Sequence, residues 1–465
     1  MRQDILGSRC PIKSVRFVRS LLSSLSSSLS SLEIEMVSPV TIAVVGAGSR
    51  GTTYARYALE RPDLAKVVAV AEPARFRRTR LAKDHGIAEE LQFADWKQLL
   101  AKGKVADAVI IATLDHLHAE GVADFSAQGY HILCEKPMAT SVADCVSMIR
   151  NVTTIPDAPR VFGIGHVLRY SPYNQAIKAV IDSGALGEII NIQHIEPVGN
   201  QHFAHSYVRG NWRREKDCSF SLMTKSCHDI DIICYYLSGL KPAKVHSFGS
   251  LGHFKKTRKP SQAGSATSCL DCQYEPDCIW SAKKIYVDTL FQPNNEKWAR
   301  HFVDADSLDV ENVMDALEKT QYGRCVYECD NDVVDHQVVN LEFEGGVTAS
   351  VTMSAFTEQV CQRGTSIQGT KGELIGDMTT FDVFDFLTRE RTHHAPKLEG
   401  GYHGGGDTGL ARTFVNSVAT GDQMVLGVTP EQVLDSHLLV FAAETARKEG
   451  RVVDFADFKA NALQT

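Results

Sequence analysis

Glu135 and Lys136 follow directly on an apolar run and are followed in turn by Pro137. The run indicates a buried strand, so its end would present both charged side chains at the edge of a sheet. Pro137 restricts Lys136 to extended backbone geometry. An ammonium group in that place can stabilise an alcohol oxygen that becomes an alkoxide as hydride leaves the neighbouring carbon. The alternative is an ordinary lysine at a strand end that reaches solvent.

A glycine-rich turn nearer the N-terminus favours the chemical interpretation. Gly46, Gly48 and Gly51 form a G-x-G-x-x-G pattern between an apolar strand-like run and a helical pattern. In that context the first glycine allows a tight turn, the second admits a pyrophosphate and the third lets helix and strand pack closely. Ser49 and Arg50 complete the turn and are expected to bind the cofactor with it. The alternative is a glycine-rich turn that binds nothing.

A second strand-like run bears on which dinucleotide would bind. It ends at Glu72, about twenty residues beyond the glycine turn, where a carboxylate would accept hydrogen bonds from the adenine ribose hydroxyls. This favours NAD. Arg75, Arg77 and Arg78 come next, and one of them could pair with the 2′-phosphate of NADP. NADP therefore stays open as the cofactor. The alternative for these arginines is an exposed, charged first turn of a helix.

Ionisable residues cluster in the stretch "SLMTKSCHDIDIICYYLSG", which otherwise indicates a buried helix. His228 could take the hydroxyl proton as hydride departs, while a neighbouring carboxylate such as Asp229 orients the ring and faces the substrate. Lys225 is a third candidate for the same site. The alternative is an N-terminal capping cluster, in which Asp229 favours the helix dipole and His228 only packs.

Polar and aromatic side chains that suit hydroxyl recognition and ring stacking gather in the stretches "EPVGNQHFAHSYVRGNWRRE" and "YHGGGD". Each could equally be a solvated loop residue. The candidates for substrate contact are His202, His205, Tyr207, Arg209, Trp212, His403 and Asp407.

Cysteines are grouped in one place. Cys269, Cys272 and Cys278 form a C-x-x-C-x(5)-C array, and Cys325 is the best candidate for a fourth ligand, ahead of Cys329. This spacing suits a tetrahedral zinc ion. The alternatives are an iron–sulfur cluster and unliganded thiols. A polar insertion around the array favours a local structural clip over chemistry.

The order of the apolar runs predicts an α/β protein of two domains. Four β-branched runs alternate with helical patterns, which predicts a doubly wound parallel sheet of the Rossmann type over residues 39–160. From 161 to 465 the runs alternate or join through Gly-Gly and Lys-Gly turns, which predicts a C-terminal α/β domain with an open, mainly antiparallel sheet. The cysteine array would lie in an insertion near 250–330. The four runs cover residues 40–45, 66–71, 107–113 and 131–136.

Composition narrows the classes of partner. The 465 residues carry a formal charge of −7 with 43% hydrophobic residues, which disfavours nucleic acid, and no apolar run approaches the roughly twenty residues of a membrane helix. Most of the twelve cysteines sit singly in apolar segments, as in a reducing cytoplasm. Residues 1–38 are basic and serine-rich, which indicates a disordered leader or an upstream extension before Met36, with a mitochondrial presequence as the alternative.

Four features together resemble the Gfo/Idh/MocA family, named for glucose-fructose oxidoreductase and inositol dehydrogenase. They are the glycine turn, the "EKP" tripeptide, the segment "LRYSPYNQAIKAVIDSGALGEI" and the "HDID" sequence, and the resemblance extends over most of the chain from Pro39. It implies the two-domain fold, a small carbohydrate substrate, and assembly into homodimers or homotetramers. It also makes Lys136 catalytic or substrate-binding and His228 the acid/base. The resemblance further places Thr113, His118 and Glu135 along the nicotinamide side and Arg169 near the substrate.

One departure from the family pattern leaves the reaction open. Many sugar-oxidising members carry an aspartate where this chain has Thr224 and a glycine where it has Lys225, so Lys225 would take over the missing electrostatic role and, with Arg169, orient the substrate. We expect an NAD(P)-dependent oxidoreductase acting on a sugar, polyol or glycoside. An NAD-retaining glycosidase or lyase that oxidises its sugar transiently is one alternative. A non-catalytic dinucleotide-binding regulator is the other.

Overall fold

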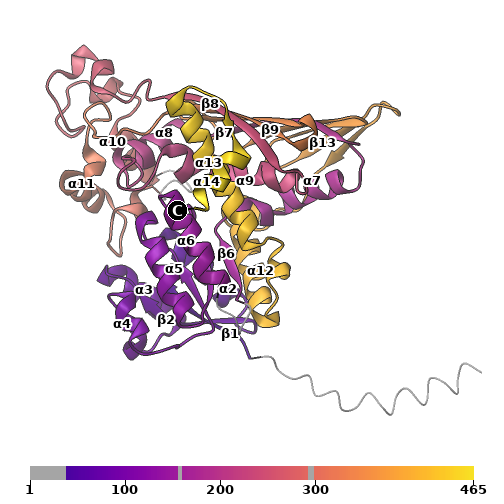
Figure 1. The fold of residues 1–465 in the computed structure, drawn as a ribbon. Coiled ribbons are helices and arrows are strands. Elements are labelled where there is room, and N and C mark those ends of the chain that lie inside the picture. The colour runs from indigo at the N-terminus through magenta and orange to yellow at the C-terminus, as the bar shows by residue number, and fades with distance from the viewer. Residues whose placement is uncertain (1–37, 155–159, 292–297, 465) are drawn as a thin grey trace, which may run out of the picture. The chain divides into compact units, whose positions relative to one another are not determined.

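A computed structural model of the chain describes residues 38–154, 160–291 and 298–464. The predicted leader lies outside the described residues except for its last position. From Val40 onward the chain forms one unit that contains two sheets, and both are visible in Figure 1.

The first sheet has six parallel strands in the order β3-β2-β1-β4-β5-β6, the order of dinucleotide-binding folds. Its central strands are almost entirely buried, which explains their continuous apolar, β-branched sequences. The strands are β1 (Val40–Val45), β2 (Ala65–Ala71), β3 (Gln92–Phe93), β4 (Ala108–Ile111), β5 (His131–Cys134) and β6 (Phe162–Ile164). The helices between them are α2 (Ser49–Glu60), α3 (Arg75–His85), α4 (Trp96–Leu100), α5 (His118–Ala127) and α6 (Val142–Thr153).

The second sheet has nine strands in the order β14-β13-β12-β11-β7-β10-β9-β8-β15. All neighbours are antiparallel except β7 and β10, which run parallel. Along β9 and β10, buried residues alternate with more exposed ones, so one face is packed and the other is open, as the alternating sequence predicts. The strands are β7 (Ile189–Pro197), β8 (Pro242–Ser250), β9 (His336–Phe343), β10 (Thr348–Ser354), β11 (Gly364–Gly369), β12 (Gly372–Gly376), β13 (Phe381–Asp385), β14 (Arg391–His394) and β15 (Val453–Asp454).

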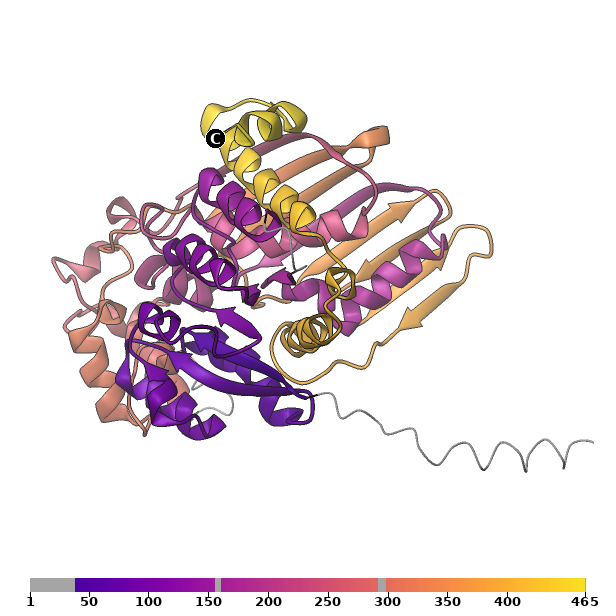
Figure 2. The ribbon, with the colours of Figure 1, turned by 60° about the horizontal axis from the view of Figure 1, so that its bottom comes forward.

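Helices line the packed face of the second sheet (Figure 2). Helix α9 contacts β7 and β10, and α13 contacts α9 and β8 as well as α6 beside the first sheet. Helix α12 contacts α2. Helix α13 therefore covers the second sheet and reaches the first domain, whereas α12 packs against the first domain. The bounds are α7 (Pro172–Asp182), α9 (Ser221–Tyr236), α12 (Gly406–Thr420), α13 (Pro430–Glu449) and α14 (Phe455–Ala462).

An insertion between β8 and β9 builds a second apolar core. It packs its short helices against α8 (Asn200–Phe203) and the π-helical segment η4 (Ala204–Arg209). The insertion contributes α10 (Ala282–Tyr286) and α11 (Val310–Lys319). No helix in the described part of the chain combines the length and the apolar character needed to cross a membrane.

Candidate active site

The glycine turn joins β1 to α2, and each glycine meets a different constraint. Gly46 has φ +90°, and a Cβ there would lie 2.4 Å from the carbonyl oxygen of Ala112. At Gly51 a Cβ would lie 2.0 Å from the carbonyl oxygen of Gly46, so the helix sits directly on the turn. A Cβ at Gly48 would meet no protein atom within 4 Å. The space beside Gly48, at the uncapped start of α2, is therefore free for a ligand.

Glu72 lies at the end of β2, beside this turn. Its side chain is almost fully buried, and its two oxygens accept hydrogen bonds from the N–H groups of Ala47 and Ala74, each at 2.8 Å. Of the arginines that follow, Arg77 pairs with Asp304 at 3.0 Å. Arg78 donates to the backbone oxygen of Glu72. The carboxylate thus faces the turn, and these two guanidinium groups have partners of their own.

Glu135 and Lys136 lie directly after β5, at the carboxyl edge of the first sheet. One oxygen of Glu135 accepts hydrogen bonds from Arg50 Nε and the Tyr54 hydroxyl, both at 2.7 Å. Burial opposes ionisation of Glu135, but the charges of Arg50 and Lys136 outweigh it and hold its pKa below the ordinary value. A second carboxylate, Asp407, also pairs with Arg50, at 2.5 Å. The glycine-turn arginine is therefore shared by two carboxylates from distant segments.

Lys136 reaches across to helix α9. Its Nζ donates to the carbonyl oxygen of Thr224 at 2.8 Å and lies 5.5 Å from the centre of the Trp212 ring. The indole N–H of Trp212 in turn donates to Asp115 at 2.9 Å. The family pattern has an aspartate at the position of Thr224. In this chain Lys136 donates to the backbone carbonyl of that residue instead.

His118 ties together the two loops that flank this lysine. Its ring is fully buried, with Nδ1 2.8 Å from the carbonyl oxygen of Pro137 and Nε2 3.3 Å from that of Thr113. Thr113 itself is partly exposed beyond β4. These contacts join the end of β4 to the "EKP" turn after β5.

His228 lies on α9, one turn beyond Thr224, and so on the side of the helix that receives Lys136. The ring is 3% exposed, its Nδ1 has no hydrogen-bond partner among the described residues, and it lies 5.6 Å from the ring of His403. Burial, followed by the charge of Lys136, lowers the pKa of His228 well below its ordinary value. The imidazole is neutral at neutral pH and can accept a proton.

The charged cluster on α9 lies inside the helix. Because α9 begins at Ser221, the interpretation of Asp229 and His228 as N-terminal capping residues is wrong. Asp229 is fully buried and accepts hydrogen bonds from Arg363 at 2.7 Å and His194 at 3.1 Å. It belongs to a charge network inside the domain.

Lys225 belongs to the same network. Its Nζ lies 2.9 Å from Glu196 and 3.1 Å from the sulfur of Cys361, and Arg363 pairs with Glu196 at 2.9 Å. Burial opposes the charge of Lys225, but Cys361 and Glu196 outweigh it and raise its pKa to about 12. Lys225 therefore stays charged and remains bonded to Glu196 and Cys361.

The remaining substrate candidates divide into internal and accessible side chains. Arg169 forms a bidentate pair with Asp231 at 2.6 and 2.7 Å and is buried. Tyr207 is 1% exposed and packs in the second core. Trp212 and His403 are partly exposed, and His403 Nδ1 lies 3.1 Å from Asp407. Lys136, Trp212 and His403 are partly exposed, and the buried His228 has an Nδ1 without a partner among the described residues. These four side chains are therefore the candidates for contact with a small molecule.

Models of two protein families match most of the chain. The family described as "oxidoreductase family, NAD-binding Rossmann fold" matches residues 40–155, and its C-terminal alpha/beta domain matches residues 178–455. The chain belongs to the Gfo/Idh/MocA oxidoreductase family. This confirms the predicted resemblance and the two-domain fold.

Curated relatives of this Gfo/Idh/MocA chain include enzymes of different reaction types. It is 29% identical over 216 residues to 2,7-anhydro-N-acetylneuraminate hydratase of Escherichia coli K12, covering 46% of this chain and 54% of that one. It is 27% identical over 200 residues to inositol 2-dehydrogenase 1 of Saccharopolyspora erythraea, covering 43% and 55%. The matched region therefore spans about half the length of these relatives.

Solved structures share the fold over nearly their full length. Levoglucosan dehydrogenase in complex with NADH and levoglucosan has a TM-score of 0.66 and 19% identity, covering 90% of this chain and 99% of that one. An oxidoreductase from Agrobacterium radiobacter, in complex with NAD+, L-tartaric acid and magnesium, has a TM-score of 0.64 and 18% identity, with the same coverage.

Another group of possible metal ligands lies near the candidate active site of this Gfo/Idh/MocA chain. His166, Cys227 and His437 have ligand atoms within 4.8 Å of one another. His437, however, donates from Nδ1 to the carbonyl oxygen of Val433 and accepts at Nε2 from the N–H of Met138. Since both of its nitrogens are engaged, His437 has no lone pair to offer, and we assign the group to packing.

Proposed function

We propose that this chain is an NAD(P)-dependent oxidoreductase that transfers hydride between nicotinamide and a hydroxyl-bearing carbon of a sugar, polyol or glycoside. The observation that carries the proposal is the bond from Lys136, at the carboxyl edge of the first sheet, to Thr224, one helical turn before His228. Folds of this kind bind their ligands at that edge. Lys136 is a cation and His228 a neutral base, which are the two groups that alcohol oxidation requires.

His228 accepts the hydroxyl proton of the substrate in this proposal. Its neutrality follows from burial and from the neighbouring charge of Lys136. Lys136 stabilises the oxygen as negative charge develops on it, an interaction made chiefly in the transition state. Bound NAD supplies the hydride acceptor. The reverse reaction uses the same groups, with His228 returning the proton.

Other residues hold this pair in place. Thr224 fixes the ammonium of Lys136 through its carbonyl, and Glu135 fixes Arg50 beside the glycine turn. His403 and Trp212 are proposed to contact the substrate because they are partly exposed next to the pair. Four other candidates are internally bonded or packed, and we assign them positioning roles rather than direct contact. They are Arg169, Tyr207, Lys225 and Asp229.

NAD is the proposed cofactor, ahead of NADP. The buried carboxylate of Glu72 lies where the adenine ribose would bind, and it would repel a 2′-phosphate. Arg77 and Arg78, which could have paired with that phosphate, bond to Asp304 and to the backbone instead. The measurement is the dissociation constant of each dinucleotide, and we expect NAD to bind at least about ten-fold more tightly.

Replacing Gly48 with alanine is expected to weaken NAD binding about ten-fold or more without lowering stability. A Cβ at this position meets no protein atom but occupies the space in which a pyrophosphate would approach the backbone. Gly51→Ala is the matched contrast, because its Cβ would collide with the backbone at 2.0 Å and cost about 1–3 kcal/mol. Titration calorimetry and thermal unfolding separate the two effects. Unchanged affinity in Gly48→Ala would place the phosphates elsewhere.

The activity is tested with the purified chain, NAD or NADP, and a panel of sugars, polyols and glycosides. Reduced nicotinamide and free product sugar are recorded together. Growth of the nicotinamide absorbance supports the dehydrogenase. Product release without net NADH points to the hydratase, glycosidase or lyase alternative, which the hydratase relative favours. Tight NAD binding with neither reduced nicotinamide nor free product sugar favours the non-catalytic regulator.

Self-association is proposed to use the open face of the second sheet. Phe248 is 65% exposed there and Ile195 41%, and a direct cross-strand row runs from Phe248 through Val338 and Thr352 to Ile195. We expect light scattering to give a dimer or tetramer that Phe248→Asp dissociates. Leu387→Asp, in the exposed turn after β13, is the control. A monomeric wild-type protein at all concentrations would contradict this assembly.

A further inference from the structure

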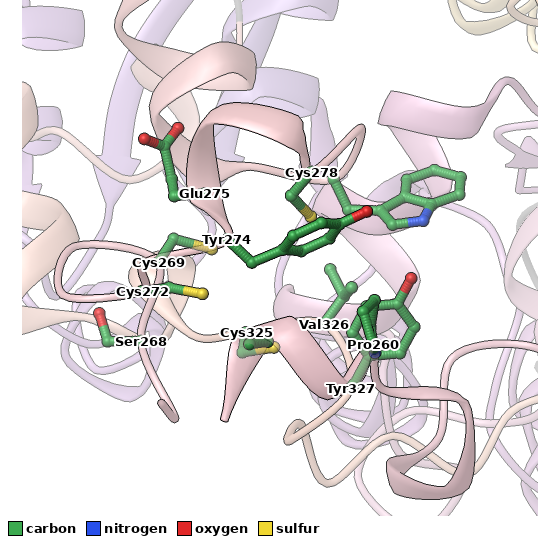
Figure 3. A pocket seen from close by; sticks show the side chains of 12 residues that line it. Pro260, Ser268, Cys269, Cys272, Tyr274, Glu275, Cys278, Cys325, Val326 and Tyr327 are labelled. Carbon is green, nitrogen blue, oxygen red and sulfur yellow. The ribbon is translucent and has the colours of Figure 1, made fainter. Parts of the chain in front are cut away.

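Four cysteines of the insertion between β8 and β9 line one small cavity. Figure 3 shows the sulfur atoms of Cys269, Cys272, Cys278 and Cys325 around a common space. The cavity measures about 10 Å³, room for a single water-sized or ion-sized occupant. Cys269 and Cys325 are buried, the other two are partly exposed, and all four are free thiols. The array predicted from sequence spacing therefore converges in space.

Local backbone hydrogen bonds position these thiols. An isolated antiparallel bridge joins Ser268 to Arg324, with the N–H of Cys269 donating to Gly323 and that of Cys325 donating to Thr267, both at 2.8 Å. Residues that flank such a bridge point to the same side of the pair, so Cys269 and Cys325 share one face.

The other two cysteines belong to the adjoining loop. The N–H of Glu275 donates to the carbonyl oxygen of Cys272 at 3.2 Å, and the N–H of Cys278 donates to that of Glu275 at 3.1 Å. These turns bring the loop back over the bridge. Two short segments therefore present all four sulfurs to one cavity.

A buried arginine beside the cavity lacks a counter-charge. Arg209 is fully buried and donates to the carbonyl oxygens of Arg324 at 2.8 Å and Trp280 at 2.7 Å, and to the sulfur of Cys269 at 3.4 Å. Among the described residues, its Nη1 has no hydrogen-bond partner and no carboxylate forms an ion pair with it. A buried guanidinium without a counter-charge is costly. Negative charge on the neighbouring sulfurs would remove that cost.

We propose that Cys269, Cys272, Cys278 and Cys325 bind one structural zinc ion as four thiolates. Each thiol releases a proton to solvent on binding, and the resulting Zn(Cys)₄ group carries a net charge of about −2 that faces Arg209. Tetrahedral zinc–sulfur bonds of about 2.3 Å hold the sulfurs roughly 3.8 Å apart. No three of these described thiols lie within 4.8 Å of one another, so the ion would draw the two segments inward.

The structure also selects the fourth ligand of the proposed site. Cys329 does not line the cavity, and its thiol donates to the carbonyl oxygen of Cys325 at 3.3 Å. Four cysteine ligands leave no open coordination position, so the ion would clip the insertion together without taking part in the reaction.

Metal analysis of the full chain, purified without chelators, tests the proposal. We expect about one zinc ion per chain in the wild-type protein and in Cys329→Ser, the matched control. Cys272→Ser and Cys278→Ser are expected to lose nearly all of it, and both leave the hydrogen bond between Arg209 and Cys269 in place. Absence of zinc, zinc retained in the two ligand variants, zinc lost equally in Cys329→Ser, or iron with inorganic sulfide would each overturn the assignment.

Folding of the variants is checked by NAD binding, which depends on the other domain. Retained NAD binding together with lost zinc supports the site, and this readout requires no enzymatic activity. If a variant also loses NAD binding, cobalt substitution of the wild-type protein decides. Intense thiolate-to-cobalt charge-transfer bands of a tetrahedral, four-sulfur site support the proposal, and the weak spectrum of an octahedral oxygen site overturns it.

Discussion

Lys136→Ala is expected to lower kcat for alcohol oxidation by about 10²–10³-fold, the usual cost of removing one group that stabilises a developing oxyanion. Lys225 cannot replace the ammonium, because it is engaged with Glu196 and Cys361. The KM of the substrate should change much less than kcat, since the interaction forms chiefly in the transition state. Steady-state kinetics with NAD and the best substrate of the panel provide the measurement.

Two controls separate this effect from a loss of structure. Lys244→Ala removes a lysine from an exposed ion pair with Glu342 and should leave kcat unchanged. NAD affinity of Lys136→Ala should stay within a few-fold of the wild-type value, because the turn around Glu135 and Arg50 is intact. A variant that retains full kcat would remove Lys136 from the mechanism and revive the regulator hypothesis.

His228→Asn is expected to lower kcat by about 10²–10⁴-fold, the contribution of a positioned general base. The amide keeps the polarity of the site but cannot take the hydroxyl proton. His393→Asn, which removes an exposed histidine from a pair with Asp382, is the matched control. Equal losses in both variants would indicate general damage rather than a missing base.

The pH profile gives an independent check on His228. Only the neutral imidazole acts as a base, and burial and the charge of Lys136 lower its pKa well below the ordinary value. The kcat/KM for oxidation should therefore stay flat as the pH falls through about 6.5, the ordinary pKa of histidine, and decline only at lower pH. An acid limb at or above that pH, due to this group, would contradict the buried, neutral assignment.

The sequence predicts the first sheet well because its signals are local. Continuous apolar runs identified β1, β2, β4 and β5, and the glycine turn gave the strand–turn–helix junction. The predicted runs 107–113 and 131–136 extend beyond the strands, which stop at Ile111 and Cys134. Hydrogen bonding to an adjacent strand determines where a strand ends, and the length of an apolar run does not predict where that pairing stops. Strand β6 belongs to the first sheet but lies just past residue 160, where the sequence predicts the first domain to end.

Helix α9 shows why a buried helix is difficult to delimit from sequence. It is buried along nearly its whole length, so no polar face alternates with the apolar one and no period marks its start. The apolar pattern begins clearly only at Ile230, which made the charges of His228 and Asp229 look terminal. They lie in the interior and depend on partners such as Arg363, from a different strand.

Local sequence patterns do not predict which residues far apart in the chain pair with one another in the site. Arg50 and Asp407 are 357 positions apart, and Asp115 and Trp212 are 97 apart. Asp115 stands in no motif, so no signal in the chain singled it out. The sequence indicates Asp407 only as a polar loop residue, and its pairing with Arg50 at the glycine turn forms when the chain folds.

The position of Arg50 links the two binding events of the proposed reaction. Its guanidinium lies at the glycine turn and pairs with Asp407, which in turn pairs with His403 beside His228. If dinucleotide binding rearranges these pairs, it changes the affinity for substrate. Substrate binding then changes the affinity for dinucleotide by the same free energy. We therefore expect the two affinities to be coupled, with Arg50→Ala reducing that coupling toward independence.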